Sequence, residues 1–243
     1  MNLSRPPGQK EASGLVHGDE LLFDDVELNN FLDSLLPLHT IGPPLTTPTS
    51  FAARFFTGRK DMMKAQDCIL FSGGAPGAET AFGSAAEQHG VEEVNFTFDG
   101  NKIERDRGIR VLNHEELVNG DVSLSYVSKL MNRRYPEPDR IRKVLQTIWY
   151  QVNSGQEVYI VGTIQEDGTV RGGTGWGAEF AKLCNKPVFV FDQVKNGWFS
   201  WDGESWVDAG EPVIGNPHFT GSGTRFLEEN GRKAIDDLFA RSF

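Results

Sequence analysis

The sequence has few cysteines and no long apolar run. Its 243 residues include only two cysteines: Cys68 lies inside an apolar run and Cys184 near the end of an amphipathic segment. This usage suits buried free thiols in a reducing compartment. No apolar stretch approaches the roughly 18 residues needed to span a bilayer, and the beginning, MNLSRPPGQKEASG, lacks the hydrophobic region of a secretory signal. We therefore expect a cytoplasmic protein without a membrane partner.

Basic residues are also scarce relative to acidic ones. The chain carries 24 Lys and Arg against 34 Asp and Glu, which gives a net charge of -10. This is the wrong sign for a protein that binds phosphate backbones along its surface. The balance makes nucleic acid an unlikely partner, although it leaves room for a local basic groove.

Metal-binding and P-loop signatures are missing from the sequence. The five histidines, at positions 17, 39, 89, 114 and 218, are scattered, and no Cys and His cluster has metal-ligand spacing. The P-loop pattern GxxxxGK[ST] does not occur. The sequence therefore predicts no metal site, no P-loop and no bound cofactor.

The composition shifts near residue 50. We expect residues 1–50 to form an N-terminal extension with one candidate helix over 24–38 and a Pro-rich linker over 40–50. The candidate helix could dock on a partner or on its own chain. Residues 51–243 contain the remaining pattern, and we expect them to form one Rossmann-like nucleotide-binding domain.

From residue 51 onward, short apolar runs alternate with helical patterns. The runs DCILF, VEEVNFTF, EVYIVG and KPVFVFD are typical of buried strands, and GWFSWDGESWVD predicts a hairpin at the sheet edge. Helices are expected over 51–65, 78–90, 121–131, 138–154, 174–185 and 226–241. This alternation predicts an α/β fold, namely a Rossmann-like, doubly wound, mostly parallel sheet with helices on both faces and a small C-terminal β-hairpin.

Two glycine-rich turns, FSGGAPGAE over 71–79 and RGGTGWGAE over 171–179, each lead from a strand toward a helix. Glycines there let backbone N–H groups approach a phosphate at the helix start, and loops at neighbouring strand ends converge on one crevice. The candidate ligand-binding residues in these turns are Ser72, Gly73, Gly74, Gly77, Glu79, Gly172, Gly173, Thr174, Gly175 and Trp176. The glycines could instead serve tight turns, Glu79 could complement the helix dipole, and Trp176 could anchor the core rather than stack on a base.

Two more candidates lie outside these turns. Asp99 follows VNFTF and is placed like the acidic residue that binds a ribose hydroxyl, although it could equally be an Asp-Gly turn residue. Arg225, in FTGSGTRF, could bind a phosphate or carboxylate, or could be a surface arginine beside a helix cap formed by Ser222 or Thr224. The basic run KIERDRGIR is interpreted as a solvated loop.

The second turn resembles the GGxGTxxE motif of the Lonely-guy phosphoribohydrolases, with Gly172, Gly173, Gly175 and Glu179 matching. Trp176 stands where that family has Thr, and Arg171 where it has Pro. The first turn is similar to the SGGAxGxD turn of the Smf/DprA DNA-processing proteins, with Glu79 in place of Asp. Both families belong to the SLOG superfamily, and the resemblance covers roughly residues 67–192. It implies a Rossmann-like sheet, a nucleotide-derived ligand and often a homodimer.

The same resemblance implies that Glu179 is the catalytic carboxylate of an N-glycosidic hydrolase. One departure concerns the Arg-Lys pair that phosphoribohydrolases carry on the preceding helix, because its spacing falls here near Ile148 and Trp149. The leading hypothesis is therefore a protein that binds a nucleotide or ribosylated metabolite and hydrolyses an N-glycosidic bond. The alternatives are a non-catalytic nucleotide sensor and, third, a single-stranded DNA-binding protein.

Overall fold

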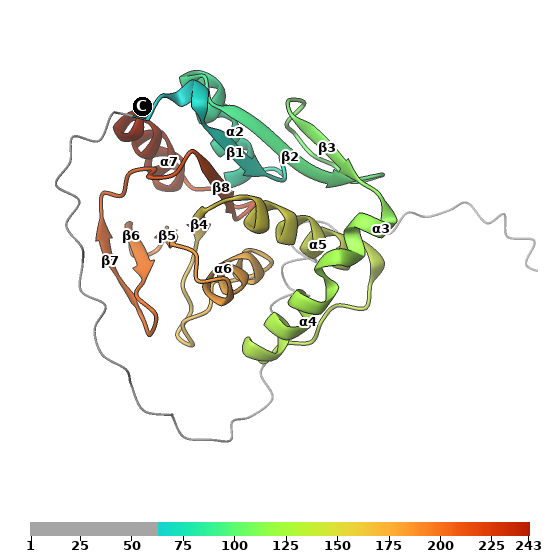
Figure 1. Ribbon diagram of the computed structural model, residues 1–243. Coiled ribbons are helices and arrows are strands. Elements are labelled where there is room, and N and C mark those ends of the chain that lie inside the picture. Colours follow the sequence, from blue (N-terminus) through green and yellow to red (C-terminus); the bar gives the residue numbers. More distant parts are fainter. Residues whose placement is uncertain (1–62) are drawn as a thin grey trace, which may run out of the picture.

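The computed structural model describes residues 63–243 (Figure 1). The extension expected over 1–50, its candidate helix and linker, and most of the helix expected over 51–65 lie outside the described residues. The last residue of that expected helix, Ala65, is the first residue of the short 3-10 helix η1 (Ala65–Asp67).

The described chain builds one eight-stranded sheet in the order β3-β2-β1-β8-β4-β5-β6-β7. The first six strands in this order are parallel to their neighbours, whereas β6 and β7 are antiparallel. The strands are β1 (Ile69–Ser72), β2 (Glu92–Phe98), β3 (Ile109–Leu112), β4 (Glu157–Gly162), β5 (Val188–Asp192), β6 (Gly197–Trp201), β7 (Trp206–Gly210) and β8 (His218–Gly223).

Helices cover both faces of the sheet. They are α2 (Ala78–His89), α3 (His114–Leu117), α4 (Asp121–Leu130), α5 (Asp139–Ser154), α6 (Thr174–Leu183) and α7 (Glu229–Ser242), with a 3-10 turn η2 (Val118–Gly120) before α4. In Figure 1, α2 and α7 lie together on one side of the sheet, and α4, α5 and α6 lie on the other. The expected Rossmann-like, doubly wound α/β fold is confirmed.

Local sequence explains the central elements. All six residues of β4 are buried, because its apolar side chains meet a helix layer on each face. Helix α2 ends at Gly90, which adopts the left-handed conformation (φ 75°) that suits a helix C-cap. The core has one cluster on the α2 and α7 side, which includes Phe82, Phe219 and Phe239, and a second on the α5 and α6 side around Leu145 and Trp176.

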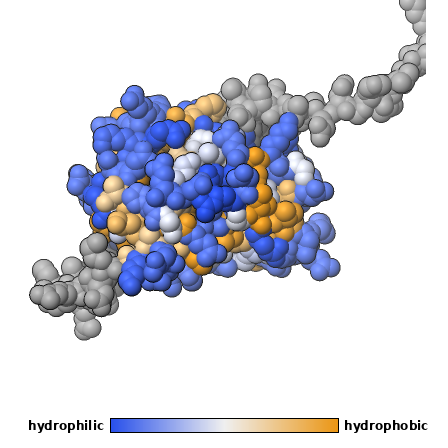
Figure 2. All heavy atoms as spheres, turned by 90° about the horizontal axis from the view of Figure 1, so that it is seen from above, coloured by the Kyte–Doolittle hydropathy of each residue, from blue (hydrophilic) through white to orange (hydrophobic). Residues whose placement is uncertain are grey.

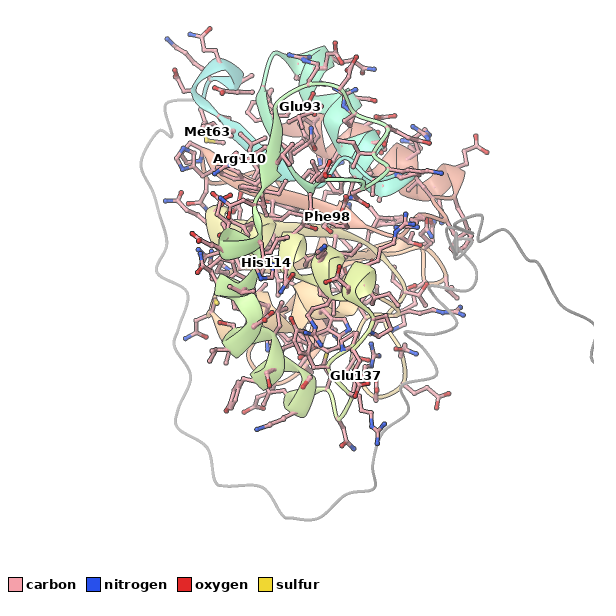
Figure 3. All side chains as sticks on the ribbon, turned by 90° about the vertical axis from the view of Figure 1, so that its right-hand side faces the viewer. Met63, Glu93, Phe98, Arg110, His114 and Glu137 are labelled. Atoms are coloured by element: carbon pink, nitrogen blue, oxygen red, sulfur yellow. The ribbon has the colours of Figure 1, made fainter. Side chains whose placement is uncertain are left out.

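Two strands were not expected from the sequence. The basic run interpreted as a solvated loop contains the start of β3, and Arg105 within it forms a salt bridge with the buried side chain of Glu93 on β2, which Figure 3 labels. The stretch FTGSGTRF belongs mostly to β8, which lies between β1 and β4 in the middle of the sheet. The sequence does not indicate β8 as a strand because of its glycines, since glycine weakens a strand and is found there mainly where another group packs closely.

The expected hairpin is present at the sheet edge as β6 and β7. Asp202 organises its turn by accepting hydrogen bonds from the N–H groups of Glu204 and Ser205 at 2.9 and 2.8 Å. Figure 2 shows mostly hydrophilic side chains on the face seen from above, with hydrophobic groups between them. Within residues 63–243, no helix is long and apolar enough to cross a membrane.

Candidate functional site

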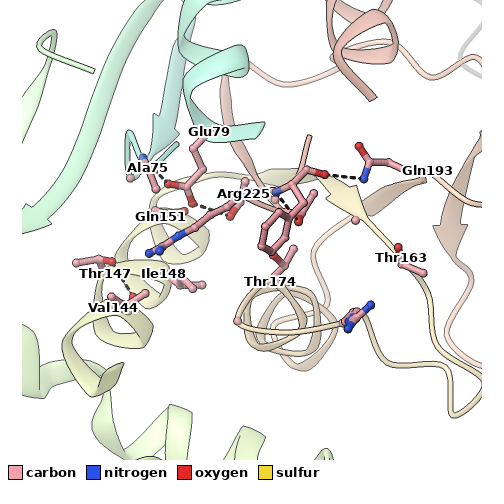
Figure 4. Close-up of a pocket in the computed structure, with 18 of the residues that line it drawn as sticks. Ala75, Glu79, Val144, Thr147, Ile148, Gln151, Thr163, Thr174, Gln193 and Arg225 are labelled. Atoms are coloured by element: carbon pink, nitrogen blue, oxygen red, sulfur yellow. Dashed lines mark hydrogen bonds between the residues drawn. The ribbon is translucent and has the colours of Figure 1, made fainter. Parts of the chain in front are cut away.

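A cavity of about 460 Å³ opens at the carboxyl ends of the parallel strands (Figure 4). Its wall comes from the segments that follow β1, β2, β4, β5 and β8, and from one side of α5. The lining residues are Gly73, Ala75, Glu79, Asn101, Val144, Thr147, Ile148, Gln151, Gly162, Thr163, Arg171, Gly173, Thr174, Gln193, Val194, Ser222, Gly223, Thr224, Arg225, Phe226 and Glu228.

The topology explains why the cavity forms there. After β1 the chain continues into α2 on one face of the sheet, and after β4 it continues into α6 on the other face. The connections therefore diverge at this point, with β8 between the two strands. Such a switch point is where doubly wound proteins bind their ligands. Both glycine-rich turns contribute residues to its wall.

Two backbone N–H groups of the first turn donate hydrogen bonds to acceptors of the protein itself. The N–H of Ala75 donates to Glu79 Oε2 at 3.0 Å, and the N–H of Ala78 donates to the Thr224 carbonyl at 3.0 Å. Gly77 has φ 90° and packs so closely on the next loop that a Cβ atom would lie 2.5 Å from the Arg225 carbonyl oxygen. The start of α2 is therefore joined to the β8–α7 loop, and these two amides are already paired.

Glu79 is a buried carboxyl in the cavity wall. Its residue is 7% exposed, and its Oε1 accepts a hydrogen bond from the Ser222 hydroxyl at 3.1 Å. Burial raises its pKa above the ordinary value, while the hydrogen bonds from Ala75, Ser222 and Gln151 and the charge of Arg225 oppose this rise. Glu79 is thus more than a residue that complements the dipole of α2.

The second turn keeps its amides available. Gly173 and Thr174 line the cavity where α6 begins, and within residues 63–243 their N–H groups have no hydrogen-bond partner. Arg171, just before them, also lines the cavity, and its backbone is fixed by a 2.9 Å hydrogen bond from its N–H to the Thr163 carbonyl. A helix N-terminus beside an arginine is a favourable environment for an anion.

Several predicted glycine-turn residues lie behind this wall. Ser72 is buried and donates to the Gly221 carbonyl at 2.7 Å, while Gly74 and Gly172 adopt left-handed turns with φ 68° and 70°. Gly175 lets α6 pack closely, because a Cβ atom there would lie 2.0 Å from the Val170 carbonyl oxygen. Together with Gly77, these residues shape the two turns without lining the cavity.

Trp176 and Asp99 also lie away from the cavity. Trp176 is fully buried in the α5 and α6 core cluster and contacts Tyr135, with ring centroids 6.0 Å apart. It therefore takes the core-anchor alternative rather than stacking on a base. Asp99 is exposed in the turn after β2, and Asn101 lines the cavity from that segment instead.

Glu179, the predicted catalytic carboxylate, is not among the lining residues either. It forms a 2.7 Å ion pair with Lys182 one turn later on α6. The Lys182 ammonium lies 3.8 Å from the ring centroid of Trp201 and 4.5 Å from that of Trp206, both on the edge hairpin. Glu179 therefore takes part in joining α6 to the hairpin, outside the cavity wall.

One group of lining residues that sequence reasoning missed lies on α5. Val144, Thr147, Ile148 and Gln151 line the cavity, and this spacing of three and four residues places them on one side of the helix. The apolar members also pack in the core cluster around Leu145, so residue type alone does not mark them as lining a cavity. The polar residues at 147 and 151 beside them are the available signal in the sequence.

Gln193 is another missed residue. Its Nε2 donates to the Phe226 carbonyl at 3.1 Å, and its Oε1 accepts from the Glu228 N–H at 2.8 Å. These contacts hold the loop that carries Arg225 against the end of β5. Arg225 lines the cavity together with Gln151 of α5, and Figure 4 labels both residues.

No protein-family model matches the chain, and no curated protein matches it. One matching solved structure, from Syntrophus aciditrophicus, is named "Putative molybdenum carrier protein"; it is 14% identical with a TM-score of 0.40, and the match covers 71% of this chain and 92% of that one. The sheet order defines the described part as a Rossmann-like α/β domain, and the cavity opens at its switch point.

Proposed function

We propose that the cavity binds a nucleotide or another ribosylated, phosphorylated metabolite. The observation that carries the proposal is that Arg171, Arg225 and the first turn of α6 line one cavity. Guanidinium groups and helix N-terminal amides are the groups that proteins use to hold phosphate. In a chain with a net charge of -10, these groups supply local positive charge that favours an anion at this part of the wall.

The remaining wall suits the uncharged part of such a ligand. Asn101, Thr147 and Gln151 offer neutral hydrogen-bonding groups, and Val144 and Ile148 offer apolar surface beside them. A sugar needs the first kind of contact and a flat base needs the second. A cavity of about 460 Å³ also falls within the 300–1,000 Å³ that is usual for small-molecule sites.

The convergence of both glycine-rich turns on one cavity supports placing the chain among the SLOG proteins. The resemblance of each turn to SLOG motifs came from sequence alone, and the two turns meet at the switch point. The homodimer that the resemblance implies stays a prediction.

A second candidate function is hydrolysis of an N-glycosidic bond, which the position of Glu79 favours. This reaction needs a carboxyl group beside the ribose, either to stabilise positive charge or to protonate the departing base. Among the described lining residues the carboxyls are Glu79 and Glu228, and Glu79 is the buried one. We propose that the catalytic role expected of Glu179 belongs to Glu79.

The binding proposal is tested by calorimetry with the full chain and AMP, GMP, CMP and UMP, using the matching nucleosides as controls. We expect the monophosphates to bind more tightly than the nucleosides. Arg171→Met should weaken AMP binding by about tenfold or more, because a charge-assisted hydrogen bond contributes about 1.5–3 kcal/mol. The control Arg110→Met removes the same charge from an exposed position on β3 and should bind AMP like the unchanged protein. Absence of binding to all four nucleotides would contradict the proposal.

The hydrolysis candidate is tested by chromatography of the same mixtures. We expect the unchanged protein to release free base. Glu79→Gln should abolish this release, and Glu179→Gln should keep it. Loss of release in Glu179→Gln with AMP binding intact would return the catalytic role to Glu179. Binding without any release of base would identify a non-catalytic nucleotide sensor.

A further inference from the structure

Glu79 has an unusual position for a residue in a site that attracts anions. Its carboxyl is buried in the wall of the cavity that Arg171 and Arg225 line, and Ser222 and Ala75 each donate one hydrogen bond to it. An anion that enters this cavity comes near a carboxylate that is itself shielded from solvent. Like charges at short range disfavour each other strongly where water is excluded.

Among residues 63–243, few other charges surround Glu79. The charged side chains of this part of the chain that line the cavity are Arg171, Arg225, Glu79 and Glu228. From the β2–β3 loop, Glu104 accepts a hydrogen bond from Thr80 at 3.2 Å, and Arg105 approaches Gly74 while paired with Glu93 and Glu87. Helix α7 packs on the far end of α2 through Phe239 and Phe82. Arg225 is thus the cation that most directly stabilises the ionised form of Glu79.

The same corner has more hydrogen-bond acceptors than donors. Gln151 is 1% exposed, and within residues 63–243 its Oε1 has no hydrogen-bond partner. A Cβ atom on Gly73 would lie 2.4 Å from Gln151 Nε2 and 2.7 Å from Glu79 Oε2, so the amide and the carboxyl are neighbours. A proton on Glu79 would add one donor where a buried acceptor lacks one.

We propose that the cavity takes up its anionic ligand together with one proton, which Glu79 carries. The proton comes from solvent and converts the Glu79 carboxylate to the neutral carboxyl. The ligand drives this uptake in two ways. Its negative charge disfavours the carboxylate, and its contact with Arg225 reduces the stabilisation that this arginine gives to the carboxylate. The inference rests on the proposed function, because it requires an anionic ligand.

Linkage makes the proposal quantitative. If binding raises the pKa of Glu79, the affinity must fall as pH rises between the free and bound pKa values. In that window each pH unit lowers the affinity by up to tenfold, and up to one proton is taken up per ligand. Burial already raises the pKa of Glu79 in the protein without ligand, so the pH window of this effect begins above the ordinary pKa range of glutamate.

The experiment is calorimetric titration of the full chain with AMP between pH 5 and 8, in buffers of different ionisation enthalpy. The buffer dependence of the observed heat gives the number of protons taken up per AMP. The AMP phosphate itself titrates at about pH 6, so its contribution is measured in Glu79→Gln and subtracted. We expect greater uptake and a steeper fall of affinity with pH in the unchanged protein. Equal uptake in both proteins would overturn the proposal.

Two further variants make the assignment specific. Glu228→Gln removes the other carboxyl of the cavity and should keep the uptake; loss of uptake there would move the proton to Glu228 and overturn the proposal. Ser222→Ala removes a hydrogen bond that stabilises the carboxylate, so the uptake should shift to higher pH, and an unchanged window would count against Glu79 even where Glu79→Gln does not fold.

The outcomes also separate this inference from the proposed function. If AMP, GMP, CMP and UMP all fail to bind the unchanged protein, the proposed function fails and the proton linkage fails with it. If AMP binds without uptake that depends on Glu79, the proposed function stands and only the proton linkage is wrong.

Discussion

Ser222 and Glu79 are 143 residues apart in the chain and are joined by a 3.1 Å hydrogen bond, from the serine hydroxyl to the glutamate carboxyl. The bond connects the central strand β8 to the start of α2. It therefore holds together the two sides of the cavity wall at its buried end. The buried carboxyl also has a stability cost, because burial disfavours its charged form.

The first prediction is that this cost appears as a pH dependence of stability without ligand. Burial raises the pKa of Glu79 in the folded state above the ordinary 4.5. Between these two values the folded protein binds more protons than the unfolded chain. The free energy of unfolding should therefore fall as pH rises through this window. Urea denaturation at several pH values between 4 and 8 measures the slope, which Glu79→Gln should reduce; an unchanged slope would contradict the assignment.

The second prediction concerns Glu179, which pairs with Lys182 beside Trp201 and Trp206. Because Glu179 lies outside the cavity wall, Glu179→Gln should leave AMP affinity within about twofold. It should lower the free energy of unfolding by at least about 1 kcal/mol, because both side chains of the ion pair are largely buried. The matched control is Asp237→Asn, which breaks the exposed pair with Lys233 and should change stability less. A large loss of AMP affinity with normal stability would show that Glu179 acts on the ligand.

The third prediction concerns Gly221 in the middle of β8. A Cβ atom there would lie 2.6 Å from Phe82 Cγ and 2.8 Å from Leu70 Cδ1. Gly221→Ala should therefore force the core apart and lower the free energy of unfolding by about 1–3 kcal/mol in urea denaturation. Gly197→Ala is the control, since within residues 63–243 a Cβ atom there would have one neighbour within 4 Å, Phe199 Cε2 at 3.9 Å. Equal stability of the two variants would refute the packing role of Gly221.

Gly221 also shows which part of the fold the sequence does not predict. The strands β1, β2, β4 and β5 are apolar runs whose burial can be inferred from residue type alone. Strand β8 has the sequence HFTGSG, and its glycines are required by neighbours such as Phe82 that are distant in the chain. A local pattern contains no information about that neighbour.

The candidate site was likewise predicted only in part from the sequence. Gly73, Glu79, Gly173, Thr174 and Arg225 were predicted and line the cavity, because position relative to a strand end is visible in sequence. The direction of a side chain on a helix is less visible. Glu179 and Trp176 lie on α6 like Thr174, but the turn of the helix carries both away from the cavity.

The fourth prediction tests the ion pair between Arg105 and Glu93. The Glu93 side chain is 2% exposed; its Oε2 accepts from Arg105 Nε at 3.2 Å and from Asn95 Nδ2 at 3.1 Å. Gly83 on α2 makes room for the pair, since a Cβ atom there would lie 2.6 Å from both Arg105 Nε and Glu93 Oε2. Arg105→Met should lower the free energy of unfolding by about 3 kcal/mol, because it leaves a buried carboxylate without its main partner.

A double-mutant cycle separates the pair from its burial. Replacing both residues, Arg105→Met with Glu93→Gln, should cost less than the sum of the single changes, since the second removes the charge that the first leaves unpaired. Arg110→Met is the control, because its ion pair with Glu116 is exposed and contributes about 0–1 kcal/mol. Urea denaturation of the four proteins measures the coupling. Additive single changes would mean that Arg107, 3.6 Å from Glu93, replaces Arg105 as its partner.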